Sequence, residues 1–163
     1  MVYAPEFHWN ASLAFGDSAA ADVARALQRT GHTVVDISQL KDSQRRGIDL
    51  LVDGEYCDVK SDRHTAHSVF FETTCDGQPG CFWKSRADYW LYWYPRDRKL
   101  YRINLPRAQQ FLAEHYNEWP EKTIRSRSRD RTWSAVGLVV PLEPMLAEGI
   151  AVDVSYLMDE DAA

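Results

Sequence analysis

The chain lacks the features of a membrane protein and of a disulfide-stabilised secreted domain. It has no run of about 18 apolar residues, so we expect no membrane-spanning helix. Its first ten residues lack a basic region followed by an apolar core, so we expect no secretory signal. Its three cysteines are an odd number, which argues against a disulfide framework and favours a reducing, cytoplasmic location.

Positive charge is also scarce, because 19 Lys and Arg stand against 24 Asp and Glu and give a formal net charge of −5. Nucleic-acid-binding domains usually carry a basic surface, so such a role would need basic residues to be concentrated locally. Two clusters provide this concentration. The first is the pair Arg45-Arg46. The second comprises four arginines within seven residues, which alternate with Ser or Asp: Arg125, Arg127, Arg129 and Arg131. We predict that these arginines contact phosphates, with a solvated loop as the alternative.

The composition predicts one folded domain over residues 1–163. The hydrophobic share is 45%, with six Trp, eight Tyr and six Phe, which is enough for a sizeable core. No internal repeat is visible. The aromatic segment 89–94 predicts a strand packed on both faces. The acidic C-terminal tail, about 159–163, is expected to fray.

The order of the predicted elements is helix, mostly antiparallel strands, helix. We predict helices at 15–30 and 105–116, a single helical turn at 144–148, and a basic loop at 122–131. We predict strands at 32–37, 48–52, 55–60, 68–74, 87–94, 99–103 and 135–140. This order favours an α/β (α+β) fold, a sandwich with one central mixed sheet flanked by helices.

A β-hairpin predicted around Asp53-Gly54 carries the most informative residues. An Asp-Gly pair is a strong two-residue turn, and it places Asp49 opposite Asp58 in the resulting register. Opposed residues have Cβ atoms roughly 5 Å apart, and Lys60 shares their face because side chains alternate with period two. Two opposed carboxylates destabilise a hairpin unless something compensates, and a magnesium ion is the obvious compensator. With Lys60 orienting or activating a water, the group predicts a phosphodiesterase site.

These residues also resemble a known family. A helix, then Gly47-Ile48-Asp49, a hairpin and Asp58-Val59-Lys60 resemble the PD-(D/E)XK nuclease superfamily, which has the restriction-endonuclease-like fold. The resemblance covers roughly residues 15–104. The runs 59–62, 71–72 and 84–89 look like those of small phage-type or resolvase-like members.

The resemblance implies a deoxyribonuclease that cleaves DNA phosphodiester bonds with Mg²⁺ or Mn²⁺. Asp49 and Asp58 would then be the metal ligands and Lys60 the catalytic lysine. Glu72 takes the place of an acidic residue on the following strand, as an extra ligand or water-holding group, or else as a rim residue. Resolvase-like action usually needs a dimer, which makes a homodimer an expectation.

One position departs from the family pattern. Many members carry a glutamate on the first helix, and that place falls near Ala20 here. Asp17, one turn earlier, could substitute for the glutamate, although an aspartate at a helix start is more often an N-cap. Asp22 is a poorer candidate because it faces the polar side of the helix.

Two alternative functions remain open at the level of sequence. A catalytically silent member of the same fold would bind nucleic acid or a protein partner without cleavage, as the missing helix glutamate and the acidic net charge suggest. A zinc module is the other alternative, although its four candidate ligands lack zinc-finger spacing: His64, His67, Cys75 and Cys81.

Overall fold

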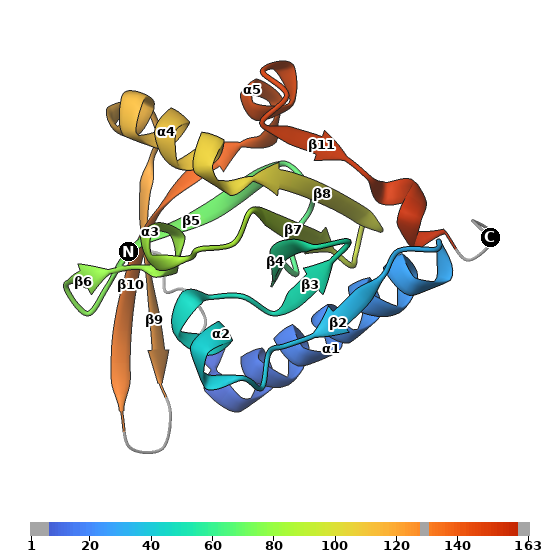
Figure 1. The fold of residues 1–163 in the computed structure, drawn as a ribbon. Helices are drawn as coiled ribbons and strands as arrows, with labels where there is room; N and C mark the ends of the chain where they lie inside the picture. The colour runs from blue at the N-terminus through green and yellow to red at the C-terminus, as the bar shows by residue number, and fades with distance from the viewer. Residues whose placement is uncertain (1–6, 128–130, 160–163) are drawn as a thin grey trace.

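Two β-sheets share one hydrophobic core in the computed structural model, which describes residues 7–127 and 131–159 (Figure 1). The helices are α1 (Trp9–Arg29), α2 (Lys41–Arg46), α3 (Cys81–Lys84), α4 (Leu105–His115) and α5 (Leu142–Ala147), with short 3₁₀ helices η1 (Tyr116–Glu118) and η2 (Ser155–Met158). The first six strands are β1 (Phe7–His8), β2 (Val34–Asp36), β3 (Leu50–Val52), β4 (Glu55–Ser61), β5 (Ser68–Cys75) and β6 (Gln78–Pro79). The others are β7 (Tyr89–Tyr94), β8 (Lys99–Asn104), β9 (Glu121–Arg127), β10 (Thr132–Pro141) and β11 (Ala151–Asp153).

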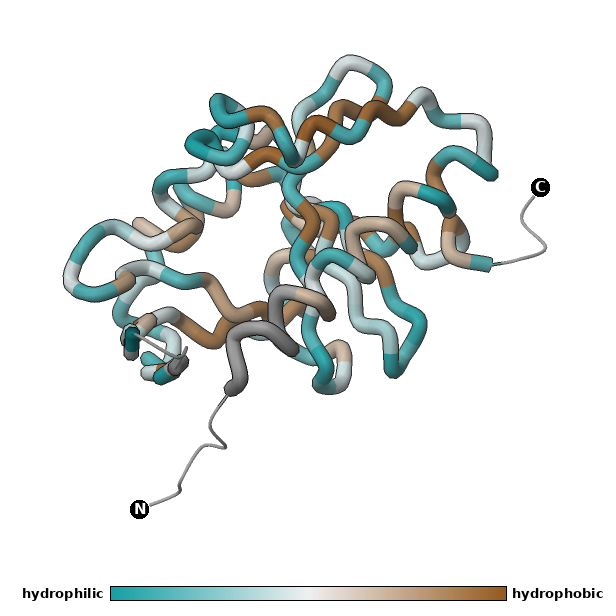
Figure 2. Tube along the Cα trace, turned by 90° about the horizontal axis from the view of Figure 1, so that it is seen from below, coloured by the Kyte–Doolittle hydropathy of each residue, from teal (hydrophilic) through white to brown (hydrophobic). Residues whose placement is uncertain are grey.

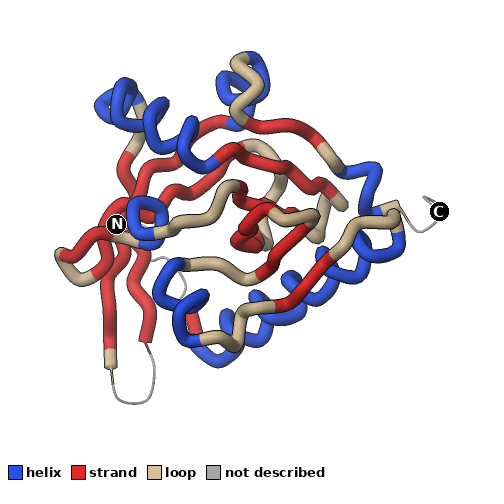
Figure 3. The backbone as a smooth tube through the Cα atoms, viewed as in Figure 1, coloured by secondary structure: helices blue, strands red, loops and turns tan. Residues whose placement is uncertain are grey.

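The strands form a six-stranded sheet of order β11-β8-β7-β4-β3-β2 and a five-stranded sheet of order β1-β9-β10-β5-β6. The fold is therefore a mixed α/β domain, but the prediction of one central sheet is wrong. The strand predicted at 68–74 exists as β5, yet it pairs with β10 rather than with the Asp53-Gly54 hairpin. In the view of Figure 3, α1 lies below the six-stranded sheet, and α4 and α5 lie above it.

The predicted hairpin is confirmed in its register. Val52 pairs with Glu55, Leu51 with Tyr56, and Leu50 with Cys57. Asp53 and Gly54 both have positive φ angles, 50° and 88°, as a turn matched to the twist of the two strands requires. The identities of these two loop residues therefore fix which side chains of β4 share a face.

Strand β4 lies inside the six-stranded sheet, antiparallel to β3 and parallel to β7. Parallel neighbours need a crossover connection, and here it contains β5, β6 and α3. The sheet is thus mixed, as predicted. Its two faces are covered differently, because α1 packs on one face and the second sheet packs on the other.

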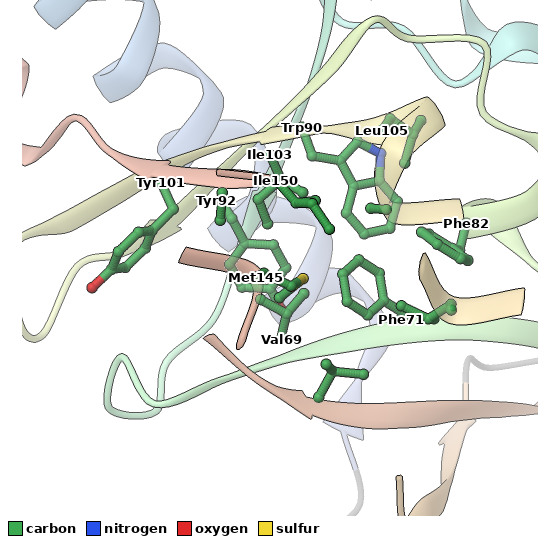
Figure 4. Packing of buried hydrophobic residues seen from close by; sticks show 14 of the residues in the cluster. Val69, Phe71, Phe82, Trp90, Tyr92, Tyr101, Ile103, Leu105, Met145 and Ile150 are labelled. Carbon is green, nitrogen blue, oxygen red and sulfur yellow. The ribbon is translucent and has the colours of Figure 1, made fainter. Parts of the chain in front are cut away.

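The alternation of β4 separates its apolar and charged side chains. Cys57 and Val59 pack with α1, against Val23 and Leu27. Asp58 and Lys60 have the opposite parity and therefore point towards the other face. That face holds the larger core, in which Trp90 and Tyr92 of β7 meet Phe71 of β5 and Phe82 of α3 (Figure 4). Strand β7 is buried on both faces, as predicted.

The long first helix starts earlier than the sequence suggests. It begins at Trp9 rather than at Phe15, so Gly16 and Asp17 lie inside it. It ends where predicted, because Gly31 adopts a left-handed φ of 91° just after its last turn. Helices α2 and α3 were not predicted, whereas α4 begins at Leu105 as expected, with the Asn104 side chain accepting a hydrogen bond from the Arg107 N–H.

The basic segment predicted as a loop is largely a strand. Residues 121–127 form β9, which pairs antiparallel with β10, and the two strands reach past α2 at the lower left of Figure 1. The cause is the length and pairing of the neighbouring strand. The segment predicted as a strand at 135–140 extends to 132–141, and its two edges pair with β5 and with β9. Residue 129 lies outside the described residues.

The surface follows the usual division of polarity. In Figure 2 the hydrophobic stretches run along the interior of the trace and the outer turns are hydrophilic. Among the described residues, 7–127 and 131–159, no helix combines the length and apolar character needed to cross a membrane.

Candidate active site

The structure brings Asp49, Asp58 and Lys60 together. Asp58 is almost fully buried, at 2% exposure, and its Oδ2 atom lies 2.9 Å from Nζ of Lys60. Asp49 sits just before β3, where its Oδ2 atom accepts a hydrogen bond of 3.0 Å from the Val59 N–H. That bond anchors the Asp49 carboxylate on β4, between the two charged residues in sequence.

The ionisable groups of this site shift one another's pKa values. Burial raises the pKa of Asp58 to about 7; the Lys60 ammonium offsets only part of this effect, and Asp49 adds a smaller upward contribution. The buried Oδ2 atom of Asp58 has the ion pair but no hydrogen bond of acceptable geometry. A carboxylate oxygen in this condition is suited to binding a further cation, because the Lys60 ammonium compensates its desolvation only in part.

Lys60 links the buried carboxylate to the solvent. Its side chain is 31% exposed, and its Nζ atom lies 5.4 Å from the centroid of the Trp90 ring. Burial alone would lower the pKa of Lys60, but the neighbouring Asp58 carboxylate outweighs it and raises that pKa above its usual value. Lys60 is therefore a protonated ammonium at neutral pH.

A pocket of about 400 Å³ opens beside Asp49, and we call it the carboxylate pocket. Asp17 and Asp36 also line it, so three carboxylates face one space. Asp17 is exposed and lies inside α1, which makes the N-cap interpretation of this residue wrong. Ala20, at the position expected for the family's helix glutamate, forms part of the same wall.

Glu72 is held by a neighbouring helix rather than by the two aspartates. Its Oε1 atom accepts a hydrogen bond of 3.0 Å from the Cys81 N–H, at the start of α3. Burial raises the pKa of the Cys81 thiol to about 12. The Lys60 ammonium lowers this pKa and the Glu72 carboxylate raises it, both by less than burial does. The thiol thus stays protonated, and the structure gives Glu72 a role in fixing α3 beside the site.

The donor set suits a hard divalent cation held by few protein ligands. Within 7–127 and 131–159, no group of three or more His, Cys, Asp or Glu side chains lies close enough to hold a metal. Asp49 and Asp58 would supply two carboxylates, and Mg²⁺ commonly keeps several waters as its remaining ligands. The unsatisfied oxygen of Asp58 is the observation in favour of this fit.

A second, larger pocket of about 680 Å³ adjoins the carboxylate pocket, and we call it the basic groove. The two share Gly16 and Val59 in their walls. The groove is rich in basic side chains, with one aspartate, Asp62, that pairs with a histidine of the same groove. The basic residues of its wall are Lys60, Arg63, His64, His67, Lys122 and Arg125.

The predicted arginines do not all lie in this groove. Arg125 lines it, whereas Arg131 forms an ion pair of 2.9 Å with Asp76 and holds the turn after β5. Arg127 belongs to β9, but its side chain lies outside what the structure describes, as does all of Arg129.

The Arg45-Arg46 pair lies on α2 and lines neither pocket. The Arg46 guanidinium packs 4.8 Å from the centroid of the Tyr56 ring and 3.7 Å from Asp42 Oδ2. These contacts give Arg46 a place in the packing of α2 against β4.

The four candidate zinc ligands are dispersed. His64 and His67 line the basic groove, whereas Cys75 is the last residue of β5. His67 directly precedes β5, and a strand rises about 3.3 Å per residue, which puts His67 and Cys75 at opposite ends of the strand. The arrangement does not support the zinc module.

Several residues of the two pockets were not singled out by the sequence, among them Asp36 of the carboxylate pocket. Arg63 and Lys122 line the basic groove, and Gly16 lies where the two pockets meet. Arg63 follows the Asp-x-Lys strand closely, and Lys122 precedes the arginine cluster, so both could have been found by extending those two segments. Gly16 offered no such indication, because a glycine near an expected helix start is usually taken as a boundary.

The comparisons with known proteins leave the geometry as the basis for any functional assignment. No family model, no curated protein and no solved structure matches the chain.

Proposed function

We propose that this protein is a metal-dependent DNA nuclease of the PD-(D/E)XK type. The observation that supports it most is the buried Oδ2 atom of Asp58, which lies beside Asp49 and 2.9 Å from the Lys60 ammonium. Two adjacent carboxylates and a lysine on one strand and its hairpin partner form a site for a cation and a phosphate. The same relationship was expected from the Asp53-Gly54 turn.

Each residue then has a defined task. Asp49 and Asp58 would hold Mg²⁺ or Mn²⁺, which would polarise a phosphodiester and lower the pKa of a coordinated water. Lys60 keeps its proton because of Asp58, so it positions the water and stabilises the developing negative charge rather than acting as a base. The hydrogen bond from Val59 N–H holds the Asp49 carboxylate in place for this role.

The basic groove provides a route for DNA to an otherwise acidic protein. Lys60 is part of its wall, so the groove leads directly to the candidate catalytic group. Lys122 and Arg125 of its wall come from β9, far along the chain from the α1 residues that also line the groove. Such a local concentration of positive charge lets an acidic chain approach a polyanion.

The second candidate function is a silent nuclease fold that binds nucleic acid or a protein partner. The observation that favours it is Ala20, because the wall of the carboxylate pocket has no side chain with a ligand atom there. Asp17, in the same wall, is the residue that would restore a third carboxylate.

A cleavage assay separates the two functions. Labelled single-stranded, duplex and branched DNA are incubated with the full chain in Mg²⁺, in Mn²⁺ and in EDTA. The nuclease proposal predicts cleavage of at least one substrate with a divalent metal and none with EDTA. Binding without cleavage in both metals would select the silent alternative, and cleavage that persists in EDTA would contradict a metal-dependent mechanism.

A further inference from the structure

We infer that the basic groove binds single-stranded DNA and that the strand reaches Asp49, in the carboxylate pocket, by passing Gly16. This inference rests on the proposed function and names its substrate more narrowly. The first observation is how deeply the Asp58 carboxylate is buried. The Asp58 side chain is only 3% exposed and lines neither pocket, so a phosphate approaches it only by entering the two pockets that adjoin it, at Asp49 and at Lys60. A strand within an intact duplex has little freedom to do so.

The size of the groove points the same way. Its volume of about 680 Å³ falls among sites of about 300–1,000 Å³ that enclose a small ligand. A cube of 680 Å³ has an edge of about 9 Å. The two strands of B-DNA are about 12 Å apart across the major groove, so both strands cannot enter a space of this width. One or two nucleotides of a single strand fit this space, and a double helix does not.

The lining of the groove combines aromatic rings with cations. Phe15 of α1 and Phe70 of β5 are half-buried and both belong to its wall. The Arg63 guanidinium lies 4.4 Å from the centroid of the Phe15 ring. Proteins bind single strands through this pairing, because bases stack on rings while cations follow the phosphates.

Phe70 is a rigid platform for such stacking. A Cβ atom at Gly137 would lie 2.6 Å from Cζ of Phe70, which shows how closely the ring covers the neighbouring strand β10. The Phe70 N–H donates a hydrogen bond of 3.4 Å to the Tyr92 hydroxyl oxygen, another group of the groove wall. The first contact fixes the ring against β10 and the second fixes the main chain that carries it, on the wall of the groove.

Gly16 joins the groove to the carboxylate pocket. It lines both, and a Cβ atom added there would meet no other atom within 4 Å. A glycine inside a helix costs about 0.5–1 kcal/mol relative to alanine. The bare backbone at this point leaves the passage open, so we assign Gly16 the role of admitting the strand.

The test measures binding in EDTA, where no metal-dependent cleavage occurs. Fluorescence anisotropy compares a single-stranded oligonucleotide of about 16 nucleotides, the upper end of common site sizes, with the duplex of the same sequence. We expect the single strand to bind at least about tenfold more tightly. Equal or tighter binding of the duplex would overturn the inference.

Two pairs of variants locate the strand. Gly16→Leu should fill the passage and weaken single-strand binding about tenfold or more, whereas Gly16→Ala should bind nearly as wild type. Both should melt no lower than wild type, because each residue is a better helix former than glycine. Phe70→Leu should weaken binding about 5- to 150-fold, the range expected for one lost stacking contact. Tyr156→Leu, which removes a ring that is 63% exposed and outside the groove, should change nothing.

The outcomes of this test and of the cleavage assay are distinct. If the protein binds a single strand, Gly16→Leu abolishes that binding, and no metal supports cleavage, then the groove is a single-strand site but the nuclease proposal is rejected. Metal-dependent cleavage with a preference for duplex binding would retain the nuclease and reject the groove as a single-strand site. Folded Gly16→Leu and Phe70→Leu proteins that bind as wild type would also reject it.

Discussion

The Nζ atom of Lys60 lies 2.9 Å from the Oδ2 atom of Asp58, an oxygen that is buried and accepts no hydrogen bond of good geometry. The ion pair keeps Lys60 protonated, yet it does not bring the pKa of Asp58 down to that of an ordinary aspartate. A buried ion pair is not by itself a stabilising device, because desolvation can exceed the Coulombic gain. A site for a cation and a phosphate explains this ion pair better than a contribution to the stability of the fold does.

The metal-free protein should lose stability as pH rises from about 4 to about 7. The folded pKa of Asp58, about 7, lies above the unfolded value of about 3.9, so the native state binds the extra proton in this window. The full effect is on the order of 4 kcal/mol for a shift of about three pH units. Urea unfolding at several pH values in EDTA measures it.

Asp58→Asn is the variant that isolates this effect. It should be more stable than wild type above pH 7 in EDTA, by less than the full effect because Lys60 loses its partner, and the difference should shrink towards pH 4. Asp42→Asn, on an 80% exposed side chain of α2, serves as control and should be neutral at every pH. A pH profile of Asp58→Asn that parallels wild type would contradict the assignment.

A divalent ion should raise the melting temperature of the wild type, and more so at higher pH. A ligand at 100 times its dissociation constant adds about 2.7 kcal/mol, which is roughly 5–10 °C for a chain of this size. The metal competes with the proton on Asp58, so the shift should grow as pH rises towards and past 7. Differential scanning calorimetry with and without Mn²⁺ gives the comparison.

The double variant Asp49→Asn with Asp58→Asn should abolish this melting shift. Asp36→Asn tests the neighbouring wall of the carboxylate pocket and should retain most of it, because Asp36 is occupied by hydrogen bonds from Ser38. A shift that survives the double substitution would place the ion elsewhere in the protein.

Arg125 should contribute to DNA binding more than Arg131 does. Arg125 lines the basic groove, whereas Arg131 is engaged with Asp76. Arg125→Ala should weaken binding for all sequences alike and reduce the salt slope by about 0.7 on a single strand. Arg86→Ala is the matched control, because Arg86 is exposed, precedes the first residue of β7 and lines neither pocket.

The four-arginine substitution at 125, 127, 129 and 131 extends that measurement. Cleavage at saturating DNA should be nearly unchanged in this variant, because phosphate contacts far from the reacting bond supply uniform binding. Identical affinities and salt slopes for the wild type and the four-fold variant would show that β9 and β10 carry only a solvated surface.

The part of the site that sequence could predict is the part governed by local rules. The Asp53-Gly54 turn fixes the hairpin, the hairpin fixes the register, and period two puts Asp58 and Lys60 on one face. Those three steps involve residues close together in the chain. They are sufficient to place Lys60 beside Asp58. Asp49 precedes the last paired residue of β3, and its place beside them depends on the side-chain hydrogen bond from the Val59 N–H, which the register does not specify.

The second sheet depends on pairings that no local pattern specifies. Phe71 pairs with Leu138, and nothing near either residue indicates the other. The start of α1 was missed for a related reason, because Gly16 is a weak helix former but the burial of Ala19, Val23 and Leu27 on the sheet stabilises the helix around it. In α2, Gly47 with its φ of 61° after two arginines was an unused helix-end signal.

The most direct test of the central claim is a single-turnover cleavage rate in Mn²⁺ for wild type, Asp58→Asn, Lys60→Met and the controls Asp42→Asn and Lys41→Met. DNA is saturating, and each protein is first shown to be folded by its melting curve. The account predicts a loss of about 100-fold or more for Asp58→Asn and Lys60→Met, as expected when metal or charge-stabilising groups are removed, and rates near wild type for both controls. Folded Asp58→Asn or Lys60→Met protein that cleaves at the wild-type rate would contradict it.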